Sequence, residues 1–94
     1  MKKDTEFALA TKNVIENLQA LRMLLNRCVS EGMIDLESAF YNEINDMLDD
    51  AKIVDTWDEL IEIITRAKTI EIDVDAWLST RGNTTMDLDW PKAP

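Results

Sequence analysis

The chain of 94 residues contains no histidine, and this absence removes a large part of familiar enzyme chemistry. Without an imidazole, no residue can activate a serine or cysteine nucleophile in the usual way, and the commonest transition-metal ligand is missing. The only two glycines stand at positions 32 and 82, which excludes a glycine-rich loop around a phosphate. We therefore expect a protein that is not an enzyme, with no catalytic residues, no metal and no cofactor.

Cysteine, proline and long apolar runs are also scarce. Cys28 is the only cysteine, so no internal disulfide can form, and its place on an apolar helix face predicts a small buried side chain. No apolar run approaches the roughly 20 residues of a membrane span. Residues 1–6 carry acids where a signal peptide needs an apolar stretch. These absences predict a cytoplasmic protein without membrane contact.

With so few residues that break helices, the apolar spacing predicts an all-α fold. Residues 4–31 form the first predicted helix, which is long and ends near Gly32. Its apolar positions alternate spacings of three and four, while Leu9 and Met23 fall on the opposite, exposed side. The buried face of this helix comprises Phe7, Thr11, Val14, Leu18, Leu21, Leu25 and Cys28, widened by Ile15, Leu24 and Val29.

Two further helices are expected. The second runs from a cap at Asp35 to about residue 51. The third begins at a capping box formed by Thr56 and Glu59, and carries Trp57 and Trp77 on its apolar side. Residues 69–75 alternate with period two, which is typical of a short strand or of a break before a fourth helix. We favour a continuous helix, because a lone strand has no partner.

The domain organisation predicted from these patterns is a bundle of three or four helices over residues 1–82 and an extended C-terminal tail over residues 83–94. In the tail, Leu88 and Trp90 alternate with acids in a segment without helical period. They either fold back onto the bundle, which we slightly favour, or form an extended recognition segment for a partner. Both residues are therefore candidates for partner binding.

Charge is unevenly distributed along the chain. The net charge is −9, yet residues 31–62 contain eleven acids and a single base, Lys52. Like charges at helical spacings repel one another, and acids at the end of the second helix oppose the helix dipole. Such local costs suggest a contact surface, although a solvated acidic face is the alternative. The candidate partner-binding acids are Glu43, Asp46, Asp49, Asp50, Asp58, Glu59 and Glu62.

Some of these acids lie one helical turn apart. The elements Glu43-x-x-Asp46 and Asp58-Glu59-x-x-Glu62 resemble the acid pairs of helical magnesium-dependent nucleotide pyrophosphatases. In that family the Glu-Glu-x-x-Glu element comes first, whereas here the order is reversed. The block also lacks bases for a nucleotide's phosphates apart from Lys52. A solvated acidic face is therefore preferred to a metal site.

The function that these patterns favour is binding to another protein that has a basic surface. Inhibitors, immunity or anti-host factors and chaperone-like adaptors all fit this description. A homodimer paired through Leu18, Leu21 and Leu25 of the long first helix is the second hypothesis. Mimicry of a nucleic acid is a third, whereas direct nucleic-acid binding is not expected, because phosphate contacts need clustered bases. The pyrophosphatase is the last alternative.

Overall fold

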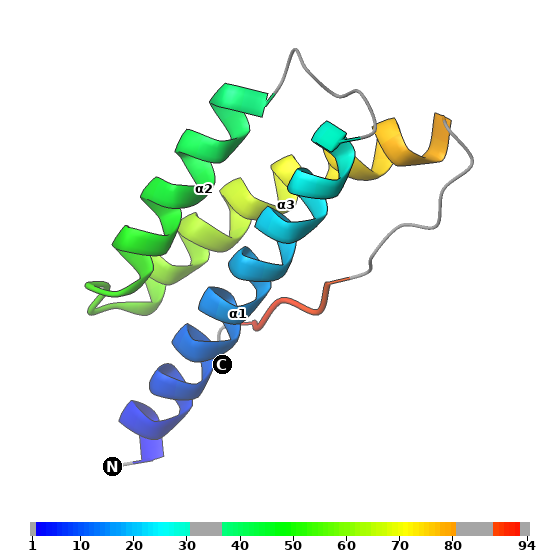
Figure 1. Ribbon diagram of the computed structural model, residues 1–94. Coiled ribbons are helices and arrows are strands. Elements are labelled where there is room, and N and C mark those ends of the chain that lie inside the picture. The colour runs from blue at the N-terminus through cyan, green and yellow to red at the C-terminus, as the bar shows by residue number, and fades with distance from the viewer. Residues whose placement is uncertain (1, 31–36, 81–87, 93–94) are drawn as a thin grey trace.

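The computed structural model describes residues 2–30, 37–80 and 88–92 of the chain, and these residues form three packed helices (Figure 1). Helix α1 spans Lys2–Ser30, α2 spans Glu37–Ala51, and α3 spans Trp57–Thr80. None of the described residues belongs to a strand. The prediction of a small all-α bundle is confirmed.

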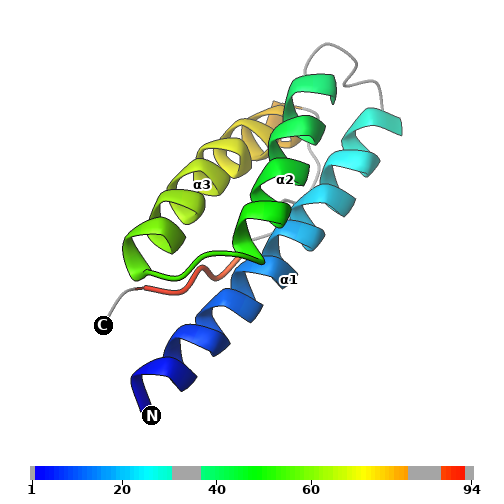
Figure 2. The ribbon, with the colours of Figure 1, turned by 90° about the vertical axis from the view of Figure 1, so that its left-hand side faces the viewer.

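Helix α1 is the longest element, and its first turns project beyond the other two helices (Figures 1 and 2). Its 29 residues extend for about 43 Å at 1.5 Å per residue, close to the 46 Å length of the whole molecule. Val14, Leu18, Leu21, Leu25 and Cys28 are completely buried, as their spacing predicts. Conversely, 59% of Leu9 and 70% of Met23 are exposed. The predicted buried and exposed faces of α1 are confirmed.

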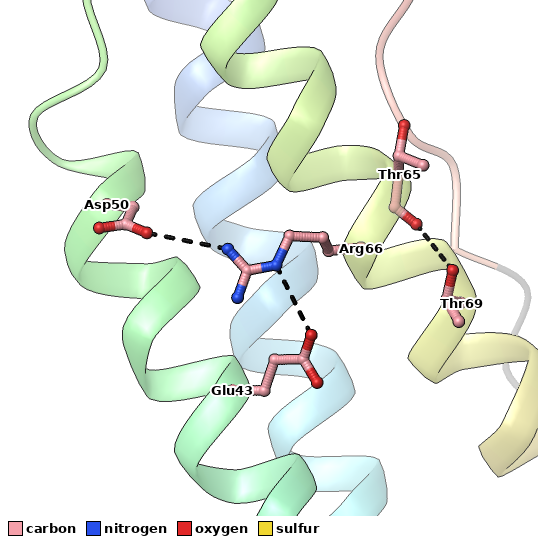
Figure 3. A network of polar contacts seen from close by, with 5 residues as sticks. All are labelled: Glu43, Asp50, Thr65, Arg66 and Thr69. Carbon is pink, nitrogen blue, oxygen red and sulfur yellow. Dashed lines mark hydrogen bonds and ion pairs between the residues drawn. The ribbon is translucent and has the colours of Figure 1, made fainter.

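Helix α3 continues without interruption through residues 69–75. Ile70 and Val74 are buried, whereas Ile72 between them is 67% exposed, so burial follows the helical period and not alternation. Threonine hydroxyls in α3 bond back to the carbonyls of the preceding turn. Thr65 donates to the Ile61 carbonyl at 2.9 Å. Thr69 donates to the Thr65 carbonyl at 3.1 Å (Figure 3). The expected continuous helix is confirmed, without a strand or break in this segment.

The predicted capping box begins α3. The Glu59 backbone N–H donates to Thr56 Oγ1 at 3.2 Å, and the Thr56 hydroxyl donates to Glu59 Oε1 at 3.0 Å. The Asp55 backbone N–H also donates to Glu59 Oε1, at 3.3 Å. The predicted ends at Gly32, Asp35 and Gly82, and with them the boundary between residues 82 and 83, lie outside the described residues.

One apolar core joins the three helices. Trp57 and Trp77 are half-buried against it, as predicted, and the sulfur of Cys28 lies inside it. The Phe7 and Trp57 rings make an edge-to-face contact with centroids 5.5 Å apart, which ties the first turns of α1 to the start of α3. Within the described segments, no helix is both long enough and apolar enough to cross a bilayer.

Candidate functional site

Four of the seven candidate acids lie where α2 ends and α3 begins. The connection between these helices, residues 52–56, is short, so the C-terminus of α2 lies beside the N-terminus of α3 (Figures 1 and 2). Asp49 and Asp50 occupy the last turn of α2, where the helix dipole disfavours anions. Asp58 and Glu59 occupy the first turn of α3, where the dipole favours them. The short connection thus brings two acidic helix ends together at one end of the bundle.

A basic residue that the sequence interpretation overlooked bridges the two helices. Arg66 of α3 reaches across to α2 and lies between two candidate acids (Figure 3). Its Nε is 3.6 Å from Glu43 Oε1, and its Nη1 is 3.9 Å from Asp50 Oδ2. All three side chains are more than one-third exposed, so these pairs stabilise the fold only weakly. Arg66 nevertheless offsets part of the repulsion between Glu43 and Asp50.

Of the remaining candidate acids, one caps a helix and four make no ion pair with a described residue. Glu59 is exposed but serves the cap of α3. Asp46, Asp49, Asp58 and Glu62 are exposed, and their carboxylates make no ion pair with other residues that the structure describes. These four are the acids whose charges are most available to a partner.

A hollow of about 270 Å³ lies between the end of α2 and the start of α3. Its lining combines three acids and one base with apolar side chains, of which Ile53 is 74% exposed. A single exposed apolar side chain is common on protein surfaces, and Ile53 is distinguished by the acids that line the hollow beside it. The hollow is lined by Asp50, Ile53, Val54, Glu59, Glu62, Ile63 and Arg66.

The acid pairs that resemble those of pyrophosphatases are not gathered into a metal site in the described part of the chain. No group of three or more acid or cysteine side chains there is arranged to hold a metal ion. Glu43 contacts the Arg66 guanidinium instead.

The C-terminal tail lies against its own bundle over residues 88–92, running back beside α1 (Figure 1). Trp90 is only 6% exposed and belongs to the core, and Leu88 is half-buried against it. In this conformation Trp90 is not available to a partner. Of the two arrangements considered for the tail, the structure has the one folded back.

Among the described residues, three hydrogen bonds join residues 88–92 to the helices. Glu71 accepts the Trp90 indole N–H at Oε1, at 3.3 Å, and the Leu88 backbone N–H at Oε2, at 3.1 Å. From the opposite helix, Asn17 Nδ2 donates to the Asp89 carbonyl at 2.7 Å. The tail is therefore fixed to α1 and α3 together.

The leucines predicted to pair two copies of α1 pack instead against the other helices of the same chain. Leu18, Leu21 and Leu25 are completely buried by the bundle's own packing. A homodimer built on these side chains would require the bundle to open. Any self-association of the folded chain therefore needs a different surface.

Asn17, Ile53, Arg66 and Glu71 were not identified from the sequence. Arg66 follows Glu62 by four residues and Glu59 by seven, so its place on the acidic face was visible in the helical spacing. Asn17 and Glu71 had no such signal, because their contacts with the tail span 72 and 19 residues of sequence. No protein-family model matches the chain, and neither a curated protein nor a solved structure shows significant similarity to it.

Proposed function

We propose that this chain is a non-enzymatic binding protein that contacts another protein through the surface where α2 meets α3. We call this surface the acidic end; it comprises Ile53 with the candidate acids Glu43, Asp46, Asp49, Asp50, Asp58, Glu59 and Glu62. The observation that carries the proposal is the 74% exposure of Ile53 in a hollow that Asp50, Glu59 and Glu62 also line.

The acidic end combines charged side chains with an exposed apolar side chain, and the two kinds of residue contribute differently to binding. Carboxylates raise the rate of encounter with a basic surface and exclude partners of like charge, but contribute little lasting affinity. An apolar side chain that becomes desolvated at the centre of a contact contributes most of the affinity. Ile53 is positioned for the second role, and the exposed acids Asp46, Asp49 and Glu62 for the first.

The partner that fits this surface is a protein with basic residues around an apolar pocket. A nucleic acid does not fit, because its phosphates would repel the same carboxylates. A protein of this kind would act as an inhibitor, an immunity or anti-host factor, or a chaperone-like adaptor. In each of these roles the acidic end would occupy a basic surface of the partner.

The test compares two sets of charge reversals that change the net charge equally. Asp46→Lys, Asp49→Lys and Glu62→Lys together reverse the acidic end, and they spare Asp50, which pairs with Arg66, and Glu59, which caps α3. The control set is Glu6→Lys, Glu16→Lys and Asp73→Lys, three exposed acids outside the acidic end. Each protein is used to capture partners from cells of its source, and association rates with the purified partner are measured at low and high salt.

The proposal predicts that a partner captured by the wild-type chain is retained by the control set and lost by the reversed acidic end. With that partner, we expect the association rate to fall at least about tenfold for the reversed acidic end, and its salt dependence to weaken. Ile53→Ser should raise the dissociation rate and leave the association rate nearly unchanged. Equal effects of the two charge sets would contradict the proposal.

A further inference from the structure

A second hollow, larger than the one at the acidic end, lies along the first half of α1. Its volume is about 630 Å³, against about 270 Å³ at the acidic end. Six of its seven lining residues belong to α1, and they form two neighbouring rows in which successive residues are four positions apart. We call this hollow the α1 groove; its apolar row is Phe7, Thr11 and Ile15, its charged row is Ala8, Lys12 and Glu16, and its seventh residue is Val54.

The apolar row is only partly covered by the bundle. Phe7, Thr11 and Ile15 are all half-buried, and its two hydrophobic members pack against the core. The Thr11 hydroxyl donates to the Phe7 carbonyl at 2.8 Å, so the single polar side-chain group of this row already has a partner. The first turns of α1 project beyond the other two helices, which leaves this row open on one side (Figures 1 and 2). A surface that covers the row removes apolar area from water.

The charged row carries a base and an acid one helical turn apart. Lys12 and Glu16 are both exposed, and neither makes an ion pair with any residue that the structure describes. Such a row is complementary to a copy of itself that runs in the opposite direction, because Lys12 of each copy then lies opposite Glu16 of the other. The midpoint of this pairing falls at position 14 of both helices.

The apolar row matches its copy under the same reversal. Thr11 of each copy lies opposite Ile15 of the other when the midpoint is at position 13, only one residue, or about 1.5 Å along the helix, from position 14. Rows with a four-residue spacing interdigitate when two helices cross at about −50°. The contact is then confined to the turns around residues 11–16, and Met23 stays outside it.

Charge limits where two copies can meet. Each chain carries a net charge of −9, so two copies repel each other over most of their surface. α2 contains five acids and no base, and α3 contains six acids and two bases, whereas α1 contains three acids and five bases. Among the three described helices, α1 alone is not net negative. The α1 groove itself has one base and one acid, so it favours a surface as balanced as itself over a strongly charged partner.

From the partly covered apolar row, the self-complementary charges and the charge of α1, we propose that the α1 groove binds the same groove of a second copy of the chain. The dimer is symmetric, with the two α1 helices crossing in opposite directions. Burial of the apolar rows stabilises it, and the two pairs between Lys12 and Glu16 fix its direction and register. The buried leucines of α1 remain inside each bundle. Val54 lines both hollows, so the groove borders the acidic end, but none of the acids there lines it, and neither proposal depends on the other.

Sedimentation equilibrium of the full chain tests the dimer. Protein concentrations run up to about 1 mM, because a contact of about two helical turns is small and predicts a weak dimer. Sodium chloride at about 0.15 M screens the repulsion between copies. Thr11→Arg should weaken the dimer at least about tenfold, because like charges then meet at the centre of the contact. Thr69→Arg is the control, since the Thr69 hydroxyl also donates to the carbonyl of the preceding turn but lies on α3.

Charge reversals test the pairing itself. Lys12→Glu and Glu16→Lys should each weaken the dimer about fivefold, because like charges then lie opposite one another. The double variant exchanges the two charges and should recover the wild-type dissociation constant to within about twofold. An equimolar mixture of the two single variants should form heterodimers more readily than either variant forms homodimers. The control pair, Lys68→Glu and Asp73→Lys, changes the net charge equally at exposed positions of α3 and should leave the dimer nearly unchanged.

Two results would overturn the proposal. One is a wild-type chain that stays monomeric throughout the concentration range. The other is a dimer that Thr11→Arg weakens no more than Thr69→Arg does, with both variants folded by circular dichroism. If Thr11→Arg does not fold, the reversals at the exposed residues Lys12 and Glu16 decide the question. A double variant that dimerises no better than the single variants would then contradict the pairing.

Discussion

Glu71 and Trp90, nineteen residues apart in sequence, are joined by a hydrogen bond of 3.3 Å from the indole N–H to the carboxylate. The second oxygen of the same carboxylate accepts the Leu88 backbone N–H. One side chain of α3 thereby fixes both the buried tryptophan and the main chain of the tail. Sequence periodicity does not predict these two hydrogen bonds of Glu71. The two bonds nevertheless help to hold residues 88–90 against the bundle.

Replacing Glu71 should test how much this relationship stabilises the protein. We expect Glu71→Ala to lower the free energy of unfolding by about 1–2 kcal/mol, because two hydrogen bonds to a partly exposed charged acceptor are lost. Glu71→Gln should cost less, because an amide still offers one oxygen acceptor. Urea unfolding monitored by circular dichroism measures both, and an Ala variant as stable as the wild type would show that the tail is not held in solution.

Removing the tryptophan itself should have a larger effect. Trp90→Ala is expected to cost about 3 kcal/mol, in the range of large core truncations, because Trp90 is 6% exposed and belongs to the core. Leu88→Ala, at a half-buried position, should cost clearly less. Urea midpoints of the two variants give the comparison. A loss below about 0.5 kcal/mol for Trp90→Ala would mean that the side chain is not buried.

The capping box gives a prediction that is local to α3. Thr56→Ala should lower stability by about 1 kcal/mol, because the Glu59 N–H loses its acceptor and the Glu59 carboxylate loses a donor. Thr56→Ser keeps the hydroxyl and should restore most of this loss. Thermal unfolding of the pair isolates the hydroxyl's contribution. Equal melting temperatures for the Ala and Ser variants would contradict the cap.

Arg66 should matter most at low ionic strength. Without it, Glu43 and Asp50 lose a common counter-ion, so Arg66→Ala should reduce stability by about 0.5 kcal/mol at low salt. The deficit should shrink in 0.5 M sodium chloride, because salt screens the repulsion that Arg66 offsets. Lys68→Ala is the control, since Lys68 is exposed and makes no ion pair with any described residue. A deficit that does not change with salt would assign the effect to packing of the arginine stem.

The sequence predicted those features that depend on local spacing. The buried face of α1, the capping box at Thr56 and the continuity of α3 follow from helical period and capping chemistry, which act within a few residues. The sequence did not predict the contacts that join segments distant along the chain. That Arg66 bridges to Glu43 depends on how α3 packs against α2, and Asn17 meets Asp89 only once the tail has turned back.

The candidate site also contains residues that the sequence predicts and a residue that it does not. The density of acids in the sequence predicts the charged residues, but no sequence pattern singles out Ile53. Its significance depends on exposure, which apolar composition alone cannot reveal, because most isoleucines are buried. The sequence therefore located the charged part of the acidic end and missed the apolar residue among the acids.

Photo-crosslinking in cells of the source tests the central claim, that the acidic end is the contact surface, most directly. A photoreactive phenylalanine is placed at Ile53, and in separate chains at Met23 and Ile72, whose side chains are 70% and 67% exposed against 74% for Ile53. We predict a discrete adduct with one protein from position 53 and none from positions 23 and 72. The same adducts from all three positions, or adducts from 23 and 72 alone, would contradict the account.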